Sequence, residues 1–351
     1  MSRKECSKID LRKGFLILCG LAWGLVVWAQ NPFNLSLVGI GGTFPQAIYA
    51  KWFEEFANLH RGVDFHYLPQ GSGEGIQSVT SGKTDFGGTD APLTDKQLAE
   101  SAVKVLHFPT VVSGVVPIYN VPGVNDSVKF TPQALAGIYL GSVIEWNDPA
   151  IALVNPGIHF PASRIVVIHT ADGRGTTYIW SDYLSKVSPE WRTHIGKGTS
   201  IVWPVGTVAE GNGNVAKTVK EAPNSIGYVE LPFAIANAVP YGSVRNAAGN
   251  FVSATLESVT AAAAAVAKNM HGDFRASLTN PPGARVYPIA SFTWILVPKK
   301  ISDKDKYTAT TQFLRWMLTE GQRYPKVLNY APLPAELVVQ ELKAVDSIST
   351  P

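Results

Sequence analysis

Apolar and polar positions along the chain fall into short blocks that predict strands followed by helices. Residues 35–40 form an apolar run, a glycine-rich turn follows at 41–45, and apolar side chains then recur at the spacing of one helix face. Residues 63–68 alternate as a second strand, and the Gly-Ser-Gly sequence at 71–73 leads into a predicted helix around 75–80. Strands that alternate in this way with helices predict an α/β fold.

Two later apolar stretches, within 106–119 and 284–298, are long enough to pass from one lobe of a protein to another. A chain that leaves one lobe, builds a second and returns would cross between them on two strands. A length of 351 residues also suggests about two domains. The periodicity between and after the two stretches predicts a strand at 164–169 and helices at 131–140, 176–186, 256–268 and 303–319.

The first 29 residues have the pattern of a secretory signal. Five basic residues precede an uncharged, mostly apolar segment at 14–28, and small residues at Val27 and Ala29 fit a cleavage site. This pattern predicts export and cleavage after Ala29, so that the mature chain begins at Gln30. An uncleaved membrane anchor is the alternative, but about 15 apolar residues fall short of the roughly 20 that a spanning helix needs.

Composition narrows the class of protein further. The chain has 30 Lys and Arg against 27 Asp and Glu and no run of five or more basic residues, which argues against nucleic acid as a partner. Removal of residues 1–29 leaves 25 basic and 25 acidic residues and no cysteine. The mature protein is therefore expected to be stabilised by its hydrophobic core without disulfides, as its length allows.

Three loops share a chemistry that suits an anion. The segments 41–43, 71–73 and 172–177 are rich in glycine and hydroxyl side chains, and each opens a predicted helix. Glycine lets backbone N–H groups approach an oxyanion closely, hydroxyls donate hydrogen bonds, and a helix N-terminus adds a positive partial charge. Ordinary N-capping by Ser and Thr is the alternative for any one loop. The seven histidines form no cluster with carboxylates, so no metal site and no cofactor are expected.

Several short motifs follow one another in an order that is typical of one family. They are Gly39-Ile40-Gly41-Gly42-Thr43-Phe44-Pro45, Gly71-Ser72-Gly73, Asp85-Phe86-Gly87-Gly88-Thr89-Asp90, Ala171-Asp172-Gly173-Arg174-Gly175-Thr176-Thr177 and Ile226-Gly227-Tyr228-Val229-Glu230. With them, the chain resembles the periplasmic phosphate-binding proteins of bacterial ABC transporters for inorganic phosphate. The resemblance extends from about residue 35 to about residue 337.

The resemblance implies a two-lobed periplasmic-binding-protein fold of type II with two hinge-crossing strands. Lobe I is then expected to comprise residues 30–112 and 290–351, and lobe II residues 113–289. Phosphate would be enclosed between the lobes. By position in the motifs, the implied ligand contacts are the backbone N–H groups of Thr43 and Phe44, the hydroxyls of Thr43 and Ser72, the loop residues Gly175 and Thr176, and the acceptor Asp90.

The sequence departs from the family pattern at the positively charged residue expected in the ligand site. The arginine expected in the site falls at Thr170, and a serine expected in the third loop is replaced by Arg174. We hypothesise that Arg174 reaches the anion with its planar fork of donors. A solvent-facing arginine is the alternative. Thr170 would contribute at most a hydroxyl.

Asp90 would explain selectivity for phosphate. An ionised carboxylate can only accept hydrogen bonds, and phosphate near neutral pH keeps a proton to donate, whereas sulfate has none. A buried unmatched pair of acceptors costs at least about 1 to 3 kcal/mol, so sulfate should bind roughly tenfold to a few hundredfold more weakly. Arsenate carries a similar proton and would not be rejected.

The expected function is that of an exported, monomeric solute-binding protein in the periplasm. It would capture phosphate, close by a hinge motion, deliver the ion to the permease subunits of an ABC transporter, and catalyse nothing. The alternatives are a receptor for another protonated tetrahedral oxyanion such as arsenate, a phosphate sensor on the same scaffold, and a secreted phosphatase with Thr43 or Ser72 as nucleophile.

Overall fold

The computed structural model describes residues 35–124, 126–270 and 272–350. Residues 33–351 form one compact unit, and the fold below is that of this unit. The predicted signal peptide, residues 1–29, lies outside the described residues. Within the described ranges, no helix has both the length and the apolar character that a membrane span requires.

Strands and helices alternate along the chain, as the hydrophobic pattern predicts. The strands are β1 (Leu35–Gly41), β2 (Val63–Leu68), β3 (Phe86–Thr89), β4 (Val105–Asn120), β5 (Lys129–Phe130), β6 (Val166–Thr170), β7 (Thr207–Ala209), β8 (Ser225–Glu230), β9 (Ser243–Arg245), β10 (Phe251–Val252) and β11 (Ala290–Pro298). The helices are α1 (Gln46–Leu59), α2 (Ser72–Thr80), α3 (Asp95–Glu100), α4 (Pro132–Leu140), α5 (Pro149–Ala152), α6 (Gly175–Val187), α7 (Pro189–His194), α8 (Gly211–Glu221), α9 (Leu231–Ala236), α10 (Leu256–Ala267), α11 (Lys304–Leu318) and α12 (Ala335–Val345). Two 3-10 helices, Glu320–Arg323 and Pro325–Leu328, separate α11 from α12.

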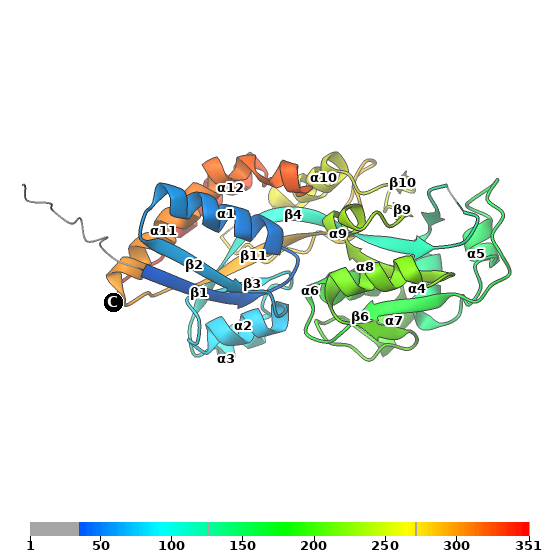
Figure 1. Ribbon diagram of the computed structural model, residues 1–351, viewed down its shortest axis with the longest axis horizontal. Coiled ribbons are helices and arrows are strands. Elements are labelled where there is room, and N and C mark those ends of the chain that lie inside the picture. The colour runs from blue at the N-terminus through cyan, green and yellow to red at the C-terminus, as the bar shows by residue number, and fades with distance from the viewer. Residues whose placement is uncertain (1–34, 125, 271, 351) are drawn as a thin grey trace, which may run out of the picture. The chain divides into compact units, whose positions relative to one another are not determined.

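Eight of the strands form one continuous sheet in the order β2-β1-β3-β11-β4-β8-β6-β7, and β10-β9-β5 form a smaller one. β1 pairs in parallel with β2 and β3, and β6 pairs in parallel with β7 and β8. The two parallel sets are joined by antiparallel strands in the middle of the sheet. Figure 1 shows the two sets as two lobes, with β4 passing from one to the other.

β4 is the first connection between the lobes. Its first part pairs with β11 as far as Gly114, and its second part pairs with β8 from Val115 onward. The chain returns beside it, where the Val115 N–H donates to the Ile289 carbonyl at 2.8 Å before β11 begins. The expected topology, in which the chain leaves one lobe and returns, is therefore confirmed. The change of strand partner lies close to the predicted boundary between 112 and 113, and the lobe bounds themselves stay a prediction.

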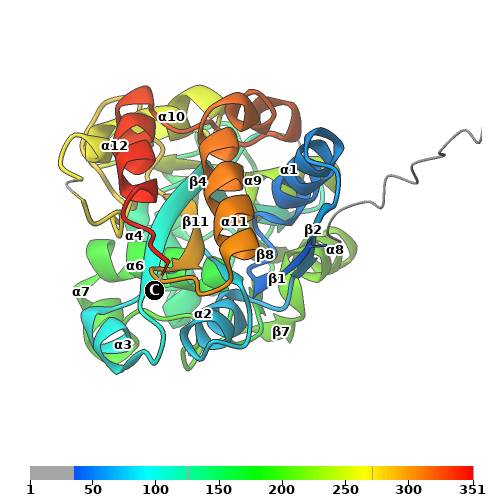
Figure 2. The same ribbon diagram turned by 90° about the vertical axis from the view of Figure 1, so that its left-hand side faces the viewer.

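Each lobe has an aromatic core. In lobe I, α1 buries one face against the sheet and α11, and the rings of Phe53 and Phe65 stack with centroids 4.7 Å apart. In lobe II, Trp180 of α6 stacks on Tyr228 of β8 at 4.9 Å. Burial of each such ring stabilises the fold by about 1.5 to 3 kcal/mol. Figure 2 shows α1, α11 and α12 above the lobe I strands and α2 and α3 below them.

Candidate functional site

Ser72 and Asp90 meet where two parallel strands of lobe I end. Ser72 is the first residue of α2, and Asp90 directly follows β3. The Ser72 hydroxyl donates to Asp90 Oδ2 at 3.2 Å and accepts from the Asp90 backbone N–H at 3.0 Å. Both side chains are buried, with exposed fractions of 0% and 1%. A helix N-terminus, a hydroxyl and a carboxylate therefore share one buried position.

The loop after β1 closes over this pair. A Cβ atom at Gly42 would lie 2.6 Å from Asp90 Oδ2, so only glycine allows the loop to pass this close to the carboxylate. The Tyr67 hydroxyl donates to the Gly42 carbonyl at 2.8 Å, and the Tyr330 hydroxyl donates to the Phe44 carbonyl at 2.6 Å. These two phenols hold the segment that carries Thr43 and Phe44.

Lobe II contributes the N-terminus of α6. A Cβ atom at Gly175, the first residue of α6, would overlap both Asp90 Oδ2 and Ser72 Oγ. The next residue, Thr176, is buried and lies within hydrogen-bonding distance of Asn212 Oδ1, at 3.1 Å. Asn212 Nδ2 in turn donates to the Thr43 hydroxyl of lobe I at 3.1 Å. The fold thus brings together the predicted residues Thr43, Phe44, Ser72, Asp90, Gly175 and Thr176.

The sequence interpretation missed Glu230, which the structure places beside Thr176. Glu230 ends β8, is fully buried, and accepts a hydrogen bond from the Thr176 hydroxyl on Oε1. The motif 226–230 was part of the family resemblance, but no role was assigned to its acidic residue. The available signal was a carboxylate at the end of an apolar strand, comparable to Asp90, which directly follows a buried strand in lobe I.

Burial raises the pKa of both acidic residues, and the charge of Asp90 also acts on Glu230. Burial raises the pKa of Asp90 to about 7, although the nearby hydroxyls of Thr293 and Ser72 act in the opposite direction. Burial and, next, the negative charge of Asp90 raise the pKa of Glu230 to about 8, although the nearby polar side chains of Thr176 and Asn212 act in the opposite direction. Asp90 Oδ1 and Glu230 Oε2 are buried and have no hydrogen-bond partner among the described residues.

Arg174 lies across the mouth of the site and bridges the two lobes. Its Nη1 donates to the Gln70 carbonyl of lobe I at 2.7 Å, and its Nη2 pairs with Glu210 Oε2 at 3.0 Å. The side chain is only 18% exposed, so the alternative of a solvent-facing arginine is wrong. Contact between Arg174 and an anion stays a prediction. Thr170 ends β6 and is buried, and its hydroxyl makes no hydrogen bond to another described residue.

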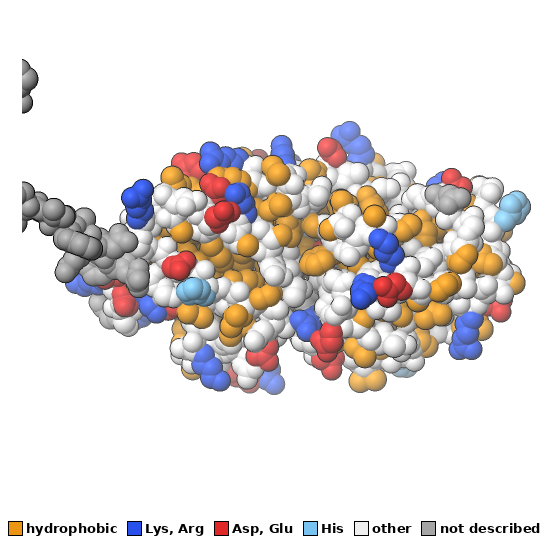
Figure 3. All heavy atoms as spheres, viewed as in Figure 1, with side chains coloured by type: hydrophobic (Ala, Val, Ile, Leu, Met, Phe, Trp, Pro, Cys, Tyr) orange, Lys and Arg blue, Asp and Glu red, His pale blue; other side chains and the backbone are white. Residues whose placement is uncertain are grey.

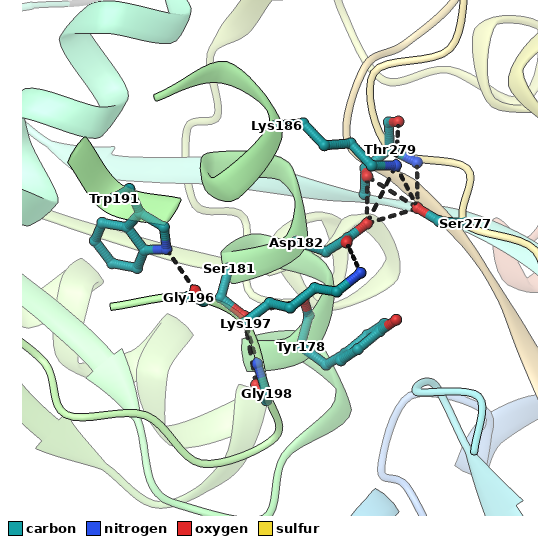
Figure 4. A network of polar contacts seen from close by, with 10 residues as sticks. All are labelled: Tyr178, Ser181, Asp182, Lys186, Trp191, Gly196, Lys197, Gly198, Ser277 and Thr279. Carbon is teal, nitrogen blue, oxygen red and sulfur yellow. Dashed lines mark hydrogen bonds and ion pairs between the residues drawn. The ribbon is translucent and has the colours of Figure 1, made fainter. Parts of the chain in front are cut away.

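An ion cluster around the buried carboxylate of Asp182 supports the loop that carries Arg174 and Gly175. Asp182 of α6 pairs with Lys197 at 2.6 Å and Lys186 at 3.3 Å and accepts from Ser277 at 2.6 Å, as Figure 4 shows. The segment after Lys197 holds the glycine loop in turn, because the Thr199 carbonyl accepts from the Arg174 N–H at 3.0 Å and the Ser200 hydroxyl from the Gly173 N–H at 2.9 Å. The Asp182 cluster therefore supports the glycine-rich loop 172–177 through the neighbouring segment 197–200.

A hollow of about 750 Å³ adjoins the site between the lobes. Its lobe I wall includes Gly73 and Ala91, the neighbours of Ser72 and Asp90 in sequence, and its lobe II wall includes Tyr178 and Lys197. Figure 3 shows the surface hollowed between the part that carries α2 and α3 and the part that carries α7. This hollow therefore lies next to the buried residues Ser72 and Asp90 without being lined by them.

The residues of the site suit an anion that carries hydrogen. Within the described residues, no group of three or more His, Cys, Asp and Glu side chains could hold a metal ion. Hydroxyls, backbone N–H groups at two helix N-termini and two acidic acceptors converge from both lobes instead. Fold and site together define a two-lobed α/β binding protein that encloses a small solute.

Comparisons with known proteins agree with this class. Residues 29–320 match the family model described as "PBP superfamily domain". The chain is 37% identical over 313 residues to the phosphate-binding protein PstS of Xylella fastidiosa strain Temecula1, which covers 89% of this chain and 85% of that protein. It is 37% identical over 310 residues to the protein of the same name in Pasteurella multocida, at 88% and 89% coverage.

A solved structure supports the fold independently of sequence. A high affinity periplasmic phosphate-binding protein named PfluDING, solved with bound phosphate, aligns with a TM-score of 0.68 and 20% identity over 90% of this chain and 100% of that one. At that identity the likeness concerns the fold alone. The sequence matches show more: the chain belongs to the PBP superfamily and, within it, to the family of phosphate-binding proteins PstS. The predicted family and fold class are confirmed.

Proposed function

We propose that this protein captures inorganic phosphate between its two lobes outside the cytoplasmic membrane and delivers it to the permease subunits of an ABC transporter. The relatives named phosphate-binding protein PstS support this proposal, because they cover most of the chain. The geometry of the site also supports the proposal, because six residues predicted to contact the ligand lie close together in the fold.

One observation carries the proposal, namely the buried carboxyl group of Asp90, whose Oδ1 has no hydrogen-bond partner among the described residues. A group of this kind accepts a hydrogen from its ligand when it is ionised, and a ligand without a hydrogen leaves two acceptors facing each other. Phosphate and arsenate satisfy this requirement, and sulfate does not. Donors on the other sides of the ligand come from Ser72 and the N-terminus of α2 in lobe I, and from the N-terminus of α6 in lobe II.

Closure of the two lobes is expected because both lobes carry residues that would contact the bound anion. Thr43, Phe44, Ser72 and Asp90 belong to lobe I, and Gly175 and Thr176 to lobe II. An anion that contacts both sets stabilises the closed arrangement by its differential affinity for the closed over the open state. Arg174 would add a donor to the same closed state, since its guanidinium already spans from lobe II to Gln70. Thr170 would offer its unpartnered hydroxyl.

The proposal also covers the cellular location of the protein and its lack of enzymatic activity. We propose that the protein is exported to the periplasm, cleaved after Ala29, active as a monomer, and not an enzyme. Release of phosphate from a chromogenic monoester that disappears in Ser72→Ala would contradict the last point.

Titration calorimetry of phosphate, arsenate and sulfate into phosphate-stripped mature protein tests the function. We expect tight binding of phosphate, and sulfate weaker by roughly tenfold to a few hundredfold or more. Sulfate binding as tight as phosphate binding, or the binding of neither, would refute the proposal. Arsenate binding that is clearly tighter than phosphate binding would instead assign the site to arsenate.

A further inference from the structure

The interlobe site contains two acidic residues in contact with one ligand loop. Gly175 lies directly against Asp90, and Thr176, the next residue, donates to Glu230. Both carboxyl groups are at most 1% exposed. Each has one oxygen satisfied, by Ser72 on Asp90 and by Thr176 on Glu230. Each also has one buried oxygen without a partner among the described residues.

Among the described residues, no Lys, Arg or His side chain pairs with the Glu230 carboxyl group. Glu230 pairs through its backbone with Val115 of β4, whose neighbouring residues are apolar. The elements around its side chain supply Thr176 from α6, Asn212 from α8, and the titratable groups Asp90, Tyr228 and Tyr330. Arg174 is engaged with Glu210 and the Gln70 carbonyl. Two carboxylates and a doubly charged phosphate in one desolvated space would repel one another strongly.

We propose that Glu230 is a second acidic residue of the anion site, and that the occupied site holds one proton between Glu230 Oε2 and the bound anion, in addition to the proton recognised by Asp90. This inference rests on the proposed function. Glu230 also positions the ligand loops of both lobes, because Thr176 and Asn212 connect it to Thr43.

The additional proton can be placed on the bound phosphate or on Glu230, and the number of protons in the site is the same in both cases. Dihydrogen phosphate would donate one hydrogen bond to Asp90 and one to Glu230. Alternatively, the Glu230 carboxylic acid would donate to an oxygen of monohydrogen phosphate, which keeps its own proton for Asp90. Both descriptions contain the same atoms and the same net charge. Burial raises the pKa of Glu230 to about 8, which agrees with a proton retained at neutral pH.

The consequence is that phosphate binding takes up a proton in mildly alkaline solution. With Asp90 alone, monohydrogen phosphate brings the only proton that is needed, so no uptake is expected. With Glu230 ionised in the solvated open form, closure on monohydrogen phosphate would take up about one proton per phosphate bound. Above the pKa values of the free groups, the apparent affinity would then fall about tenfold for each pH unit.

The experiment is calorimetric titration of inorganic phosphate into phosphate-stripped mature protein at pH 6.5 and 8.5, in buffers of different ionisation enthalpy. We expect uptake of about one proton per phosphate at pH 8.5 for the parent and about one fewer for Glu230→Gln, whose amide is a permanent donor. The affinity of the parent for phosphate should fall between pH 6.5 and pH 8.5. In the variant this fall should be smaller by a factor of about ten or more. Glu341→Gln is the matched control, since Glu341 is an equally buried carboxyl group on α12 and should bind like the parent.

Two different failures can be told apart. A parent that binds no phosphate at either pH refutes the proposed function. A parent that binds phosphate without proton uptake at pH 8.5 overturns the role of Glu230 alone, even if the variant does not fold. Equal proton uptake by the parent and a folded Glu230→Gln variant overturns it as well.

Discussion

Gly175→Ala gives the sharpest test of the interlobe geometry. The added methyl group would overlap Asp90 Oδ2 and Ser72 Oγ, which belong to the opposite lobe. Neither group can move away easily, because both are buried and hydrogen-bonded to each other. The overlap is relieved when the lobes separate. The substitution should therefore penalise the closed arrangement and leave each lobe intact.

The size of the effect follows from overpacking. An extra methyl group in a tightly packed interior costs about 1 to 3 kcal/mol. Since every 1.4 kcal/mol is about tenfold in affinity, the dissociation constant for phosphate should rise roughly fivefold to 150-fold. Titration calorimetry on phosphate-stripped protein measures this, and thermal unfolding without phosphate should change much less than the affinity.

Gly213→Ala is the matched control. Gly213 lies on α8 of lobe II, and a Cβ atom there would meet nothing within 4 Å. This control should bind phosphate like the parent and be equally or slightly more stable, since alanine favours a helix by up to about 1 kcal/mol. If Gly175→Ala binds as tightly as the control, the placement of α6 against Asp90 in the bound protein is refuted.

Three further predictions concern charged residues. Asp90→Asn replaces an acceptor with a donor, so the preference for phosphate over sulfate should fall at least about tenfold in competition titrations; an unchanged preference would contradict the role of Asp90. Arg174→Ala should weaken phosphate binding, because it removes a donor and the contact with Gln70, whereas equal affinity would disprove the hypothesis for this residue. Asp182→Asn should lower the free energy of unfolding by about 1 to 3 kcal/mol at pH 7 in denaturant titrations. Burial disfavours the charged form of Asp182 and so raises its pKa. Lys186, Lys197 and two hydroxyls have a larger effect in the opposite direction, so that the pKa of Asp182 is lowered overall. This stabilisation is therefore present above the ordinary aspartate pKa and is lost as the pH falls through the lowered value, so parent and variant should converge in acid.

Local sequence determines much of the fold. The alternation at 63–68 coincides with β2, and the predicted helices at 256–268 and 303–319 match α10 and α11 within a residue at each end. The start of α10 is fixed by Thr255, whose hydroxyl accepts from the Ser258 N–H in a capping box. These features depend on residues a few positions apart, so periodicity and capping are enough to predict them.

Only part of the candidate site could be predicted from the sequence. Thr43, Ser72 and Asp90 could be proposed because each follows a strand at a loop of recognisable composition and because the motifs resemble one family. The orientation of Arg174 could not be predicted. Its Gln70 and Glu210 partners lie far from it in sequence, and no local pattern determines where a long side chain turns.

By itself, the sequence determined several of the strand and helix segments, three loops rich in glycine and hydroxyls, and the family, because these follow from local periodicity, glycine positions and ordered motifs. Only the tertiary structure decided that Gly175 lies against Asp90 and that Glu230 joins the same site. The antiparallel pairing of β4 with both β11 and β8 brings the two parallel strand sets together. The electrostatic effect of Asp90 on Glu230 depends on that pairing, and the raised pKa values of both residues come mainly from the burial that it creates.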